Sequence, residues 1–198
     1  MKIDEAKVVL DLRPLIRLCP FCLLPRQKLD QVYNDHVHSG TPFCNMRVIM
    51  CGDREWGSPD YIGYKSEDYY TAGSAVRSMT SDKQIIHDIV KNFPKGTVVI
   101  EGEATGADKM SATEGMAHSY LTLPFPARWD LHGRAAGPIR NQQMIDEGKP
   151  THVIWFHHDI SKSKGTKDMV RRAEKCCIPT FSWMEWLNIK ADVNDGLR

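Results

Sequence analysis

The stretch that decides the fold is Thr151 to Trp183, THVIWFHHDISKSKGTKDMVRRAEKCCIPTFSW. It starts with an apolar run of strand length (residues 151–157) and passes through a polar loop into a helix-like segment (residues 165–176). A second apolar run (residues 178–183) closes it. Two apolar runs separated by a helix of this length predict a strand–helix–strand unit with parallel strands.

The same alternation extends upstream to Met46. Further strands are predicted at residues 47–52, 96–102 and 121–127, the last as a strand or an extended edge because its prolines limit ladder bonding. Further helices are predicted at residues 81–93, 106–120, 136–148 and 184–190. In the second of these helices we expect four residues to face inward: Ala107, Met110, Met116 and Ala117. The fold class is therefore α/β, a Rossmann-like three-layer sandwich with a mainly parallel sheet.

The first 45 residues are predicted to be a short N-terminal extension before a domain at 46–198. A C-x-x-C pair followed by a His and a Cys can hold zinc tetrahedrally, with Cys19, Cys22, His36 and Cys44 as ligands. The alternative is a loosely ordered leader with incidental cysteines, which we favour. A structural zinc is the only cofactor that the sequence suggests.

Bulk composition restricts the class of protein. With 41% hydrophobic and 26% charged residues in 198, the chain has a globular balance. A net charge of +1 argues against a protein that coats nucleic acid or membrane through its overall field. There is no apolar run of the ~18–20 residues that a membrane span needs, and the N-terminus does not resemble a signal peptide. We expect a cytoplasmic protein whose six cysteines are reduced thiols or metal ligands. A homo-oligomer is compatible with the sequence.

Ligands of such sheets bind beyond the carboxyl ends of the strands, so the loops there are the candidate site. Two of these loops combine glycine with the start of a helix, which is the pattern of an anion site. The first contains Gly102, Thr105, Gly106 and Asp108, and the second contains Gly165, Thr166 and Asp168. The alternatives are a helix capped by Thr105 and a solvated, lysine-rich loop.

Two further segments carry cations. In DLHGRAAGPIRNQQM (residues 130–144), Arg134 and Arg140 suit phosphate or carboxylate, His132 can exchange a proton, and Asn141 can bond a hydroxyl or amide edge. The alternative is that Arg140 pairs with a buried carboxylate and that Gly133 and Gly137 are turn residues.

In CGDREW (residues 51–56), Gly52 ends the first strand. Arg54 offers a cation and Trp56 a stacking face for a nucleobase, unless Trp56 is packing.

The motifs MRVIMCGDREW, VVIEGEATGADKMS, HGRAAGPIRNQQMID and SKGTKDMVRRAEKCCIP come in the order and spacing of the SLOG superfamily. The chain resembles its YspA-like (cpYpsA-related) branch over about residues 46–183. The resemblance implies a Rossmann-like fold that binds a nucleotide or nucleotide-derived ligand. By position, the implied ligand loops are Gly52 to Arg54, Gly102 to Asp108, Arg134 to Asn141 and Gly165 to Asp168.

The chain departs from these families in both of the glycine-containing loops. Glu103 stands where the branch usually has a second Gly, and Thr105 stands where it has a basic residue. The related LOG phosphoribohydrolases use a PGG-x-GT-x-x-E loop. Here SKGTKDM lacks the Pro-Gly-Gly and has Met169 in place of the Glu, with Asp168 the nearest acid.

Three functions remain open. The first is binding of a nucleotide or ADP-ribose-like ligand, as a sensor or a sequestering protein. The second is a nucleotide-processing hydrolase whose acid or base is Asp108, Asp168, Glu101 or Glu103, assisted by His132. The third is a nucleic-acid-processing protein with an N-terminal zinc module, which the near-neutral charge disfavours.

Overall fold

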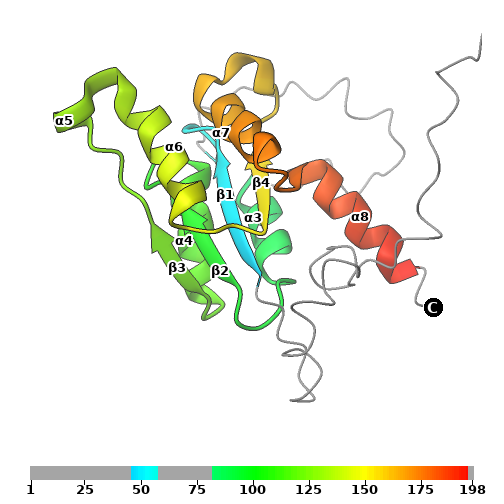
Figure 1. Cartoon of the computed structure of the whole chain (residues 1–198). Coiled ribbons are helices and arrows are strands. Elements are labelled where there is room, and N and C mark those ends of the chain that lie inside the picture. The colour runs from blue at the N-terminus through cyan, green and yellow to red at the C-terminus, as the bar shows by residue number, and fades with distance from the viewer. Residues whose placement is uncertain (1–45, 58–81, 196–198) are drawn as a thin grey trace, which may run out of the picture.

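A five-stranded parallel sheet in the order β3-β2-β1-β4-β5 forms the centre of the computed structural model, which describes residues 46–57 and 82–195 (Figure 1). The strands are β1 (Arg47–Gly52), β2 (Val98–Glu101), β3 (Leu121–Pro124), β4 (His152–Phe156) and β5 (Thr180–Ser182). This confirms the predicted Rossmann-like α/β fold. Residues 1–45, with the predicted zinc ligands, lie outside the described residues.

Strand β1 is the middle strand of the sheet, and both of its faces are covered. Val48, Ile49 and Met50 are fully buried, which is why this strand is a continuous apolar run rather than an alternating one. Val48 aligns with Val99 of β2 on one side and with His152 of β4 on the other. Strands β2 and β3 thus extend the sheet on one side of β1, and β4 and β5 extend it on the other, so the strand order reverses between β1 and β4.

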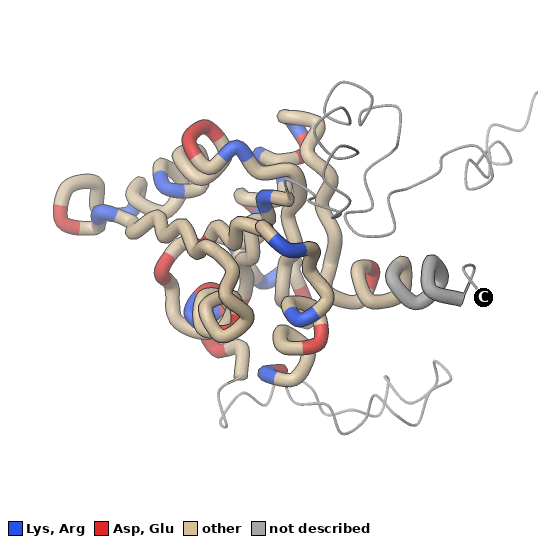
Figure 2. Tube along the Cα trace, turned by 90° about the horizontal axis from the view of Figure 1, so that it is seen from below, with Lys and Arg blue, Asp and Glu red and all other residues tan. Residues whose placement is uncertain are grey.

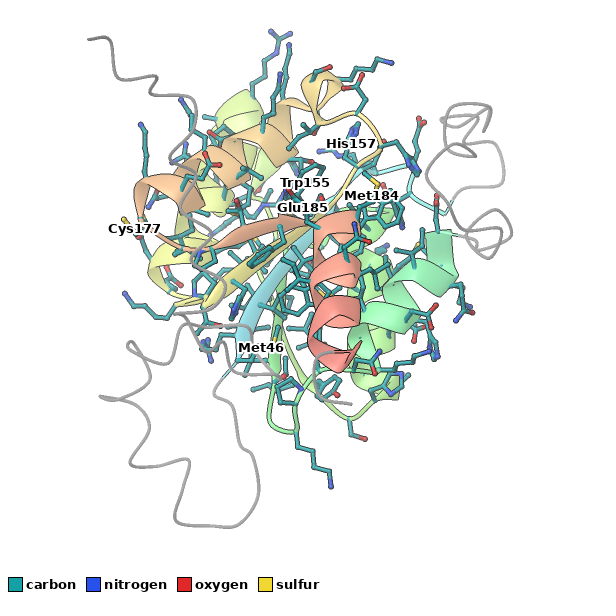
Figure 3. All side chains as sticks on the ribbon, turned by 90° about the vertical axis from the view of Figure 1, so that its right-hand side faces the viewer. Met46, Trp155, His157, Cys177, Met184 and Glu185 are labelled. Carbon is teal, nitrogen blue, oxygen red and sulfur yellow. The ribbon has the colours of Figure 1, made fainter. Side chains whose placement is uncertain are left out.

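Helices cover both faces of the sheet (Figures 1 and 3). On one face lie α3 (Asp82–Val90), α4 (Ala107–Ala117) and α8 (Trp183–Asp195), and on the other lie α6 (Ala136–Asp146) and α7 (Lys164–Lys175). The short α5 (Trp129–His132) and the 3-10 turn η3 (Gly133–Ala135) precede α6 and project away from the sheet in Figure 1. A further 3-10 turn, η4 (Ile160–Lys162), precedes α7. None of the helices in the described ranges has the length and apolar character to cross a membrane.

The inward face of α4 differs from the prediction. Ala107 is buried and Met110 is partly buried, as expected, but Met116 is 59% exposed and Ala117 is also exposed. The buried stripe consists instead of small or polar residues: Ala107, Asp108, Ser111 and Gly115. A Cβ on Gly115 would lie 3.2 Å from the side chains of Val99 and Thr122, so close approach to the sheet selects small residues over large ones on this helix.

The starts of α4 and α7 also differ from the prediction. The N-cap of α4 is Gly106 without a side-chain cap hydrogen bond, so Thr105 does not cap it. Helix α7 begins one residue earlier than expected, because Ser163 Oγ accepts the Thr166 N–H at 3.1 Å. Asp168 therefore falls beyond the first turn.

Trp56 is a packing residue rather than a stacking face for a ligand. Its ring is 1% exposed, lies against His158 with centroids 4.6 Å apart, and contacts Trp183 edge-on at 6.0 Å. Its indole N–H donates to the Asp82 carbonyl at 3.1 Å. The apolar ring is thus packed inside the protein, and its one polar atom has a hydrogen-bond partner there.

We predict that Trp56→Ala lowers the free energy of unfolding by about 3–5 kcal/mol, since it leaves a large cavity in the core. Trp129→Ala is the matched control. Because Trp129 is 50% exposed, it should cost about 1 kcal/mol or less. Urea denaturation of both variants measures the difference, and equal losses would contradict the packing role of Trp56.

Candidate functional site

A cavity of about 470 Å³ lies at the carboxyl edge of the sheet, between the loops that follow β1 and β4. Residues 51–55 and residues 162–166 form its two sides. Figure 3 shows this edge at His157, with Met46 marking the opposite, amino edge. Strand order reverses between β1 and β4, and this is where open α/β sheets bind ligands.

The cavity brings together predicted residues from four loops. They are Gly52, Arg54, Asp108, Arg140, Asn141, Gly165 and Thr166. A second cavity of about 310 Å³ adjoins it, is lined by Gly102, Thr105 and Trp129, and shares Arg54, Ala104 and Arg140 with the first. Gly106 lies behind the cavities, where a Cβ would be 2.2 Å from the Asp53 carbonyl oxygen.

Three predicted residues lie away from these cavities. His132 and Arg134 are exposed on α5 and η3, and Gly137 packs against the ring of Trp129. His132 lines a separate, shallower hollow beside the outer side of α6. The expected cluster of cations is therefore divided. Arg140 turns to the sheet edge, whereas Arg134 precedes α6 and stays in solvent.

Asp108 is an internal anion at the start of α4. Its Oδ2 accepts the Gly102 N–H at 3.1 Å and lies 3.4 Å from Arg140 Nη1. Burial raises the pKa of Asp108, and the Arg140 charge and the amides of Gly102, Ala104 and Gly52 act in the opposite direction. Asp108 therefore places a negative charge in the loop where we expected a phosphate to bind. The alternative, that Arg140 pairs with a buried carboxylate, is what the structure shows.

Glycine at position 102 is required by this ion pair. A Cβ there would lie 1.0 Å from Arg140 Nη1, so only glycine lets the guanidinium pass over the end of β2. The next residue, Glu103, has a φ of 54°, in the left-handed region that favours glycine. Its N–H donates at 2.5 Å to Glu101, whose carboxyl pKa is raised by burial. Glu101 therefore supports the loop and does not line either cavity.

Arg140 stands between the two cavities and lines both. Its side chain is 13% exposed, and its buried Nε has no hydrogen-bond partner among the described residues. A buried donor without a partner is uncommon in folded proteins.

The start of α7 differs from that of α4 because no side-chain carboxylate sits on it. A Cβ on Gly165 would meet nothing within 4 Å, and Lys162 and Lys164 line the same side of the cavity. Asn141 Nδ2 donates to the Gly165 carbonyl at 3.2 Å and to Asp168 Oδ2 at 3.1 Å. Its amide therefore holds α6 against α7.

Asp168 is engaged by arginines and does not line the cavity. Arg172 Nε and Arg171 Nη2 each donate to it at 2.7 Å. Burial acts to raise the pKa of Asp168, but the hydrogen bonds from Arg172, Arg171 and Asn141 outweigh it and lower that pKa. A carboxyl with a lowered pKa is a poor general acid.

Two side chains at the site, those of His157 and Trp129, were not predicted from the sequence. His157 is the first residue after β4, and its Nε2 lies 3.4 Å from Asp53 Oδ2 in the larger cavity. Its position directly beyond a strand could have drawn attention to it. Trp129 lies under the guanidinium of Arg54, 5.7 Å from the ring centroid. No local sequence pattern predicts that Trp129 lines a cavity, because its position depends on how α5 projects from the fold.

The fold and the position of its cavity define the class as a Rossmann-like protein with a candidate site at the strand-order reversal. The chain is similar to the Gene 61 protein of Mycobacterium phage D29, with 29% identity over 142 residues that cover 69% of this chain and 95% of the phage protein. That name describes no activity. No family model matches the chain, and no solved structure matches it.

We predict that Asp168→Asn lowers the free energy of unfolding by about 1 kcal/mol near pH 7, because it removes the acceptor charge for two arginines. The folded-state pKa of Asp168 lies below the unfolded value of about 3.9. The stabilisation is therefore complete above pH 5 and is lost as the pH falls through the folded-state pKa.

Urea denaturation between pH 7 and pH 3 measures this change. The control is Glu174→Gln, an exposed acid on the same helix, which should cost little at either pH. If Asp168→Asn lowered the free energy of unfolding by as much at pH 3 as at pH 7, the ion-pair interpretation would be contradicted.

Proposed function

We propose that the chain binds a nucleotide or a nucleotide-derived ligand of the ADP-ribose type in the two adjoining cavities. The observation that carries the proposal is the N-terminus of α7, which borders the larger cavity at the strand-order reversal. Ser163 takes the Thr166 amide there, but the space beside Gly165 is open. Sheets of this kind hold the phosphates of nucleotides at such helix N-termini. The resemblance to YspA-like proteins points to the same class of ligand.

The phosphate is assigned to α7 rather than α4. First-turn amides of a helix have no partner within the helix, and at α4 the Ala107 N–H already donates to the Asp53 carbonyl at 3.0 Å and the Lys109 N–H to the Ala104 carbonyl at 3.2 Å. At α7, the backbone around Gly165 is open to a close approach. Lys162 and Lys164 add two positive charges beside it. A phosphate therefore binds one helix N-terminus and does not bridge both.

The remainder of the ligand is assigned to the smaller cavity. Trp129 is half exposed there and already receives the Arg54 cation on its ring. An aromatic ring beside an arginine suits a planar, polar base. Arg140, between the cavities, offers the exposed part of its side chain to a ribose or phosphate oxygen.

Binding is better supported than hydrolysis. Asp108 is 2% exposed and bonded to amides and to Arg140, and Asp168 is held by Arg171 and Arg172. Met169 lines the larger cavity at the position where LOG-type loops carry a glutamate. A sensor or a sequestering protein requires no general acid at these positions.

Nucleic-acid processing has less support. Basic and acidic positions are interspersed around the described fold (Figure 2), and the net charge of the whole chain is +1. A nucleic-acid surface depends on an excess of positive charge along one face.

We predict that Gly165→Ala weakens the binding of AMP or ADP-ribose by roughly tenfold or more, because the new methyl group occupies the space of the phosphate. The fold should be unharmed or stabilised by about 0.5–1 kcal/mol, since alanine is the better helix residue and nothing lies within 4 Å. Isothermal titration calorimetry and urea denaturation measure the two effects.

Lys164→Ala should weaken binding as well, whereas Lys95→Ala should not, since Lys95 is exposed in the turn before β2, at the opposite edge of the sheet. Mass spectrometry of the recovered ligand then separates binding from turnover. Intact AMP or ADP-ribose supports a binding protein. Release of free base and ribose phosphate would show hydrolysis, and equal affinity of all variants would remove α7 from the site.

A further inference from the structure

A second cluster of chemically active side chains lies between α3 and α4, away from the cavities. His87 belongs to α3, Glu114 to α4, and His118 is the C-cap of α4. His87 Nδ1 lies 3.0 Å from Glu114 Oε2, and His118 Nε2 lies 3.9 Å from the same oxygen. One donor atom of each of the three residues lies within 4.8 Å of the other two.

Helix geometry explains why these side chains meet. Glu114 and His118 are four residues apart, so they share one face of α4. Helix α3 buries Ile86, Ile89 and Val90 in the core, and His87 is left at its boundary with α4. Glu114 and His118 are six and ten residues beyond Asp108 along α4, or roughly 9 and 15 Å. The cluster is therefore separate from the nucleotide cavity.

An ordinary ion pair accounts for His87 and Glu114 but not for His118. His118 Nε2 is too far from the shared oxygen for a hydrogen bond, yet the two imidazole rings lie only 5.4 Å apart at their centroids. The i,i+4 spacing brings His118 beside Glu114, and this leaves two imidazole rings and one carboxylate oxygen converging on a common point. A cation at that point could bind all three donors at once.

The spacing suits a tetrahedral metal ion. Zinc bonds imidazole nitrogen and carboxylate oxygen at about 2.0–2.2 Å, which places neighbouring ligand atoms about 3.3–3.6 Å apart. The two distances to Glu114 Oε2, 3.0 and 3.9 Å, lie on either side of this value. The side chains of His87, Glu114 and His118 are 38%, 12% and 30% exposed, so an ion can enter from solvent.

We propose that His87, Glu114 and His118 form a binding site for a divalent transition-metal cation, with zinc as the favoured ion. Three protein ligands leave the fourth tetrahedral position to solvent. The ion links α3 to α4 at the end of α4 remote from the cavities. The site does not depend on the proposed nucleotide function.

The test is titration of the metal-free, full-length protein with Co²⁺, followed by displacement with Zn²⁺. We expect one equivalent of Co²⁺ with the intense visible absorption of a tetrahedral ion and without a thiolate charge-transfer band. His87→Ala, His118→Ala and Glu114→Gln should each weaken binding by roughly tenfold or more. His132→Ala, a change at an exposed histidine outside the cluster, should leave it unchanged.

Thermal unfolding gives a second measurement. At a free zinc concentration roughly 100 times the dissociation constant, the melting temperature should rise by about 5–10 °C. This rise should vanish in His118→Ala and persist in His132→Ala.

A Cys19→Ser/Cys22→Ser variant separates this site from the cysteines of the N-terminal extension. It should retain the Co²⁺ spectrum described above. Three results would each overturn the proposal: no metal bound, binding unaffected by His118→Ala, or binding lost in the cysteine variant with a thiolate band in the parent protein.

Discussion

The buried carboxylate of Asp108 is the interaction on which the carboxyl edge of the sheet depends. It joins the loops after β1 and β2 through the amides of Gly52, Gly102 and Ala104, and it draws in Arg140 from α6. A buried carboxylate is tolerated only where donors and a cation compensate its lost hydration. The glycine at position 102 follows from the same constraint, since any side chain there would displace the guanidinium.

This internal anion makes the two helix N-termini at the site unequal. At the start of α4 the Asp108 carboxylate bonds the neighbouring loop, whereas at the start of α7 Ser163 takes the Thr166 amide and Gly165 stays open beside two lysines. The two sides of the site therefore differ in what they offer to a ligand. In the proposed binding mode, a ligand anion lies on the α7 side and the rest of the ligand extends past Arg140 toward Trp129.

Helix α4 connects the regions of interest. Its small residues let it lie close against β2 and β3, which places Asp108 at the cavity edge and Glu114 and His118 near the other end, against α3. A change in the packing of this helix would move both groups together. The proposed cation at the remote end would therefore support the geometry of the cavity without touching a ligand.

The sequence by itself determined the sheet, the order of its elements and the loops at its carboxyl edge. Hydrophobic periodicity is a local signal, and the buried runs of β1 and β4 show it plainly. Only the tertiary structure decided that Arg140 pairs with Asp108, that Trp56 is core while Trp129 faces the cavity, and that His87 meets His118. These outcomes depend on side chains brought together across the sheet and between helices, such as Asp108 and Arg140, which are 32 positions apart. Local patterns carry no information about which of several available partners packing will supply.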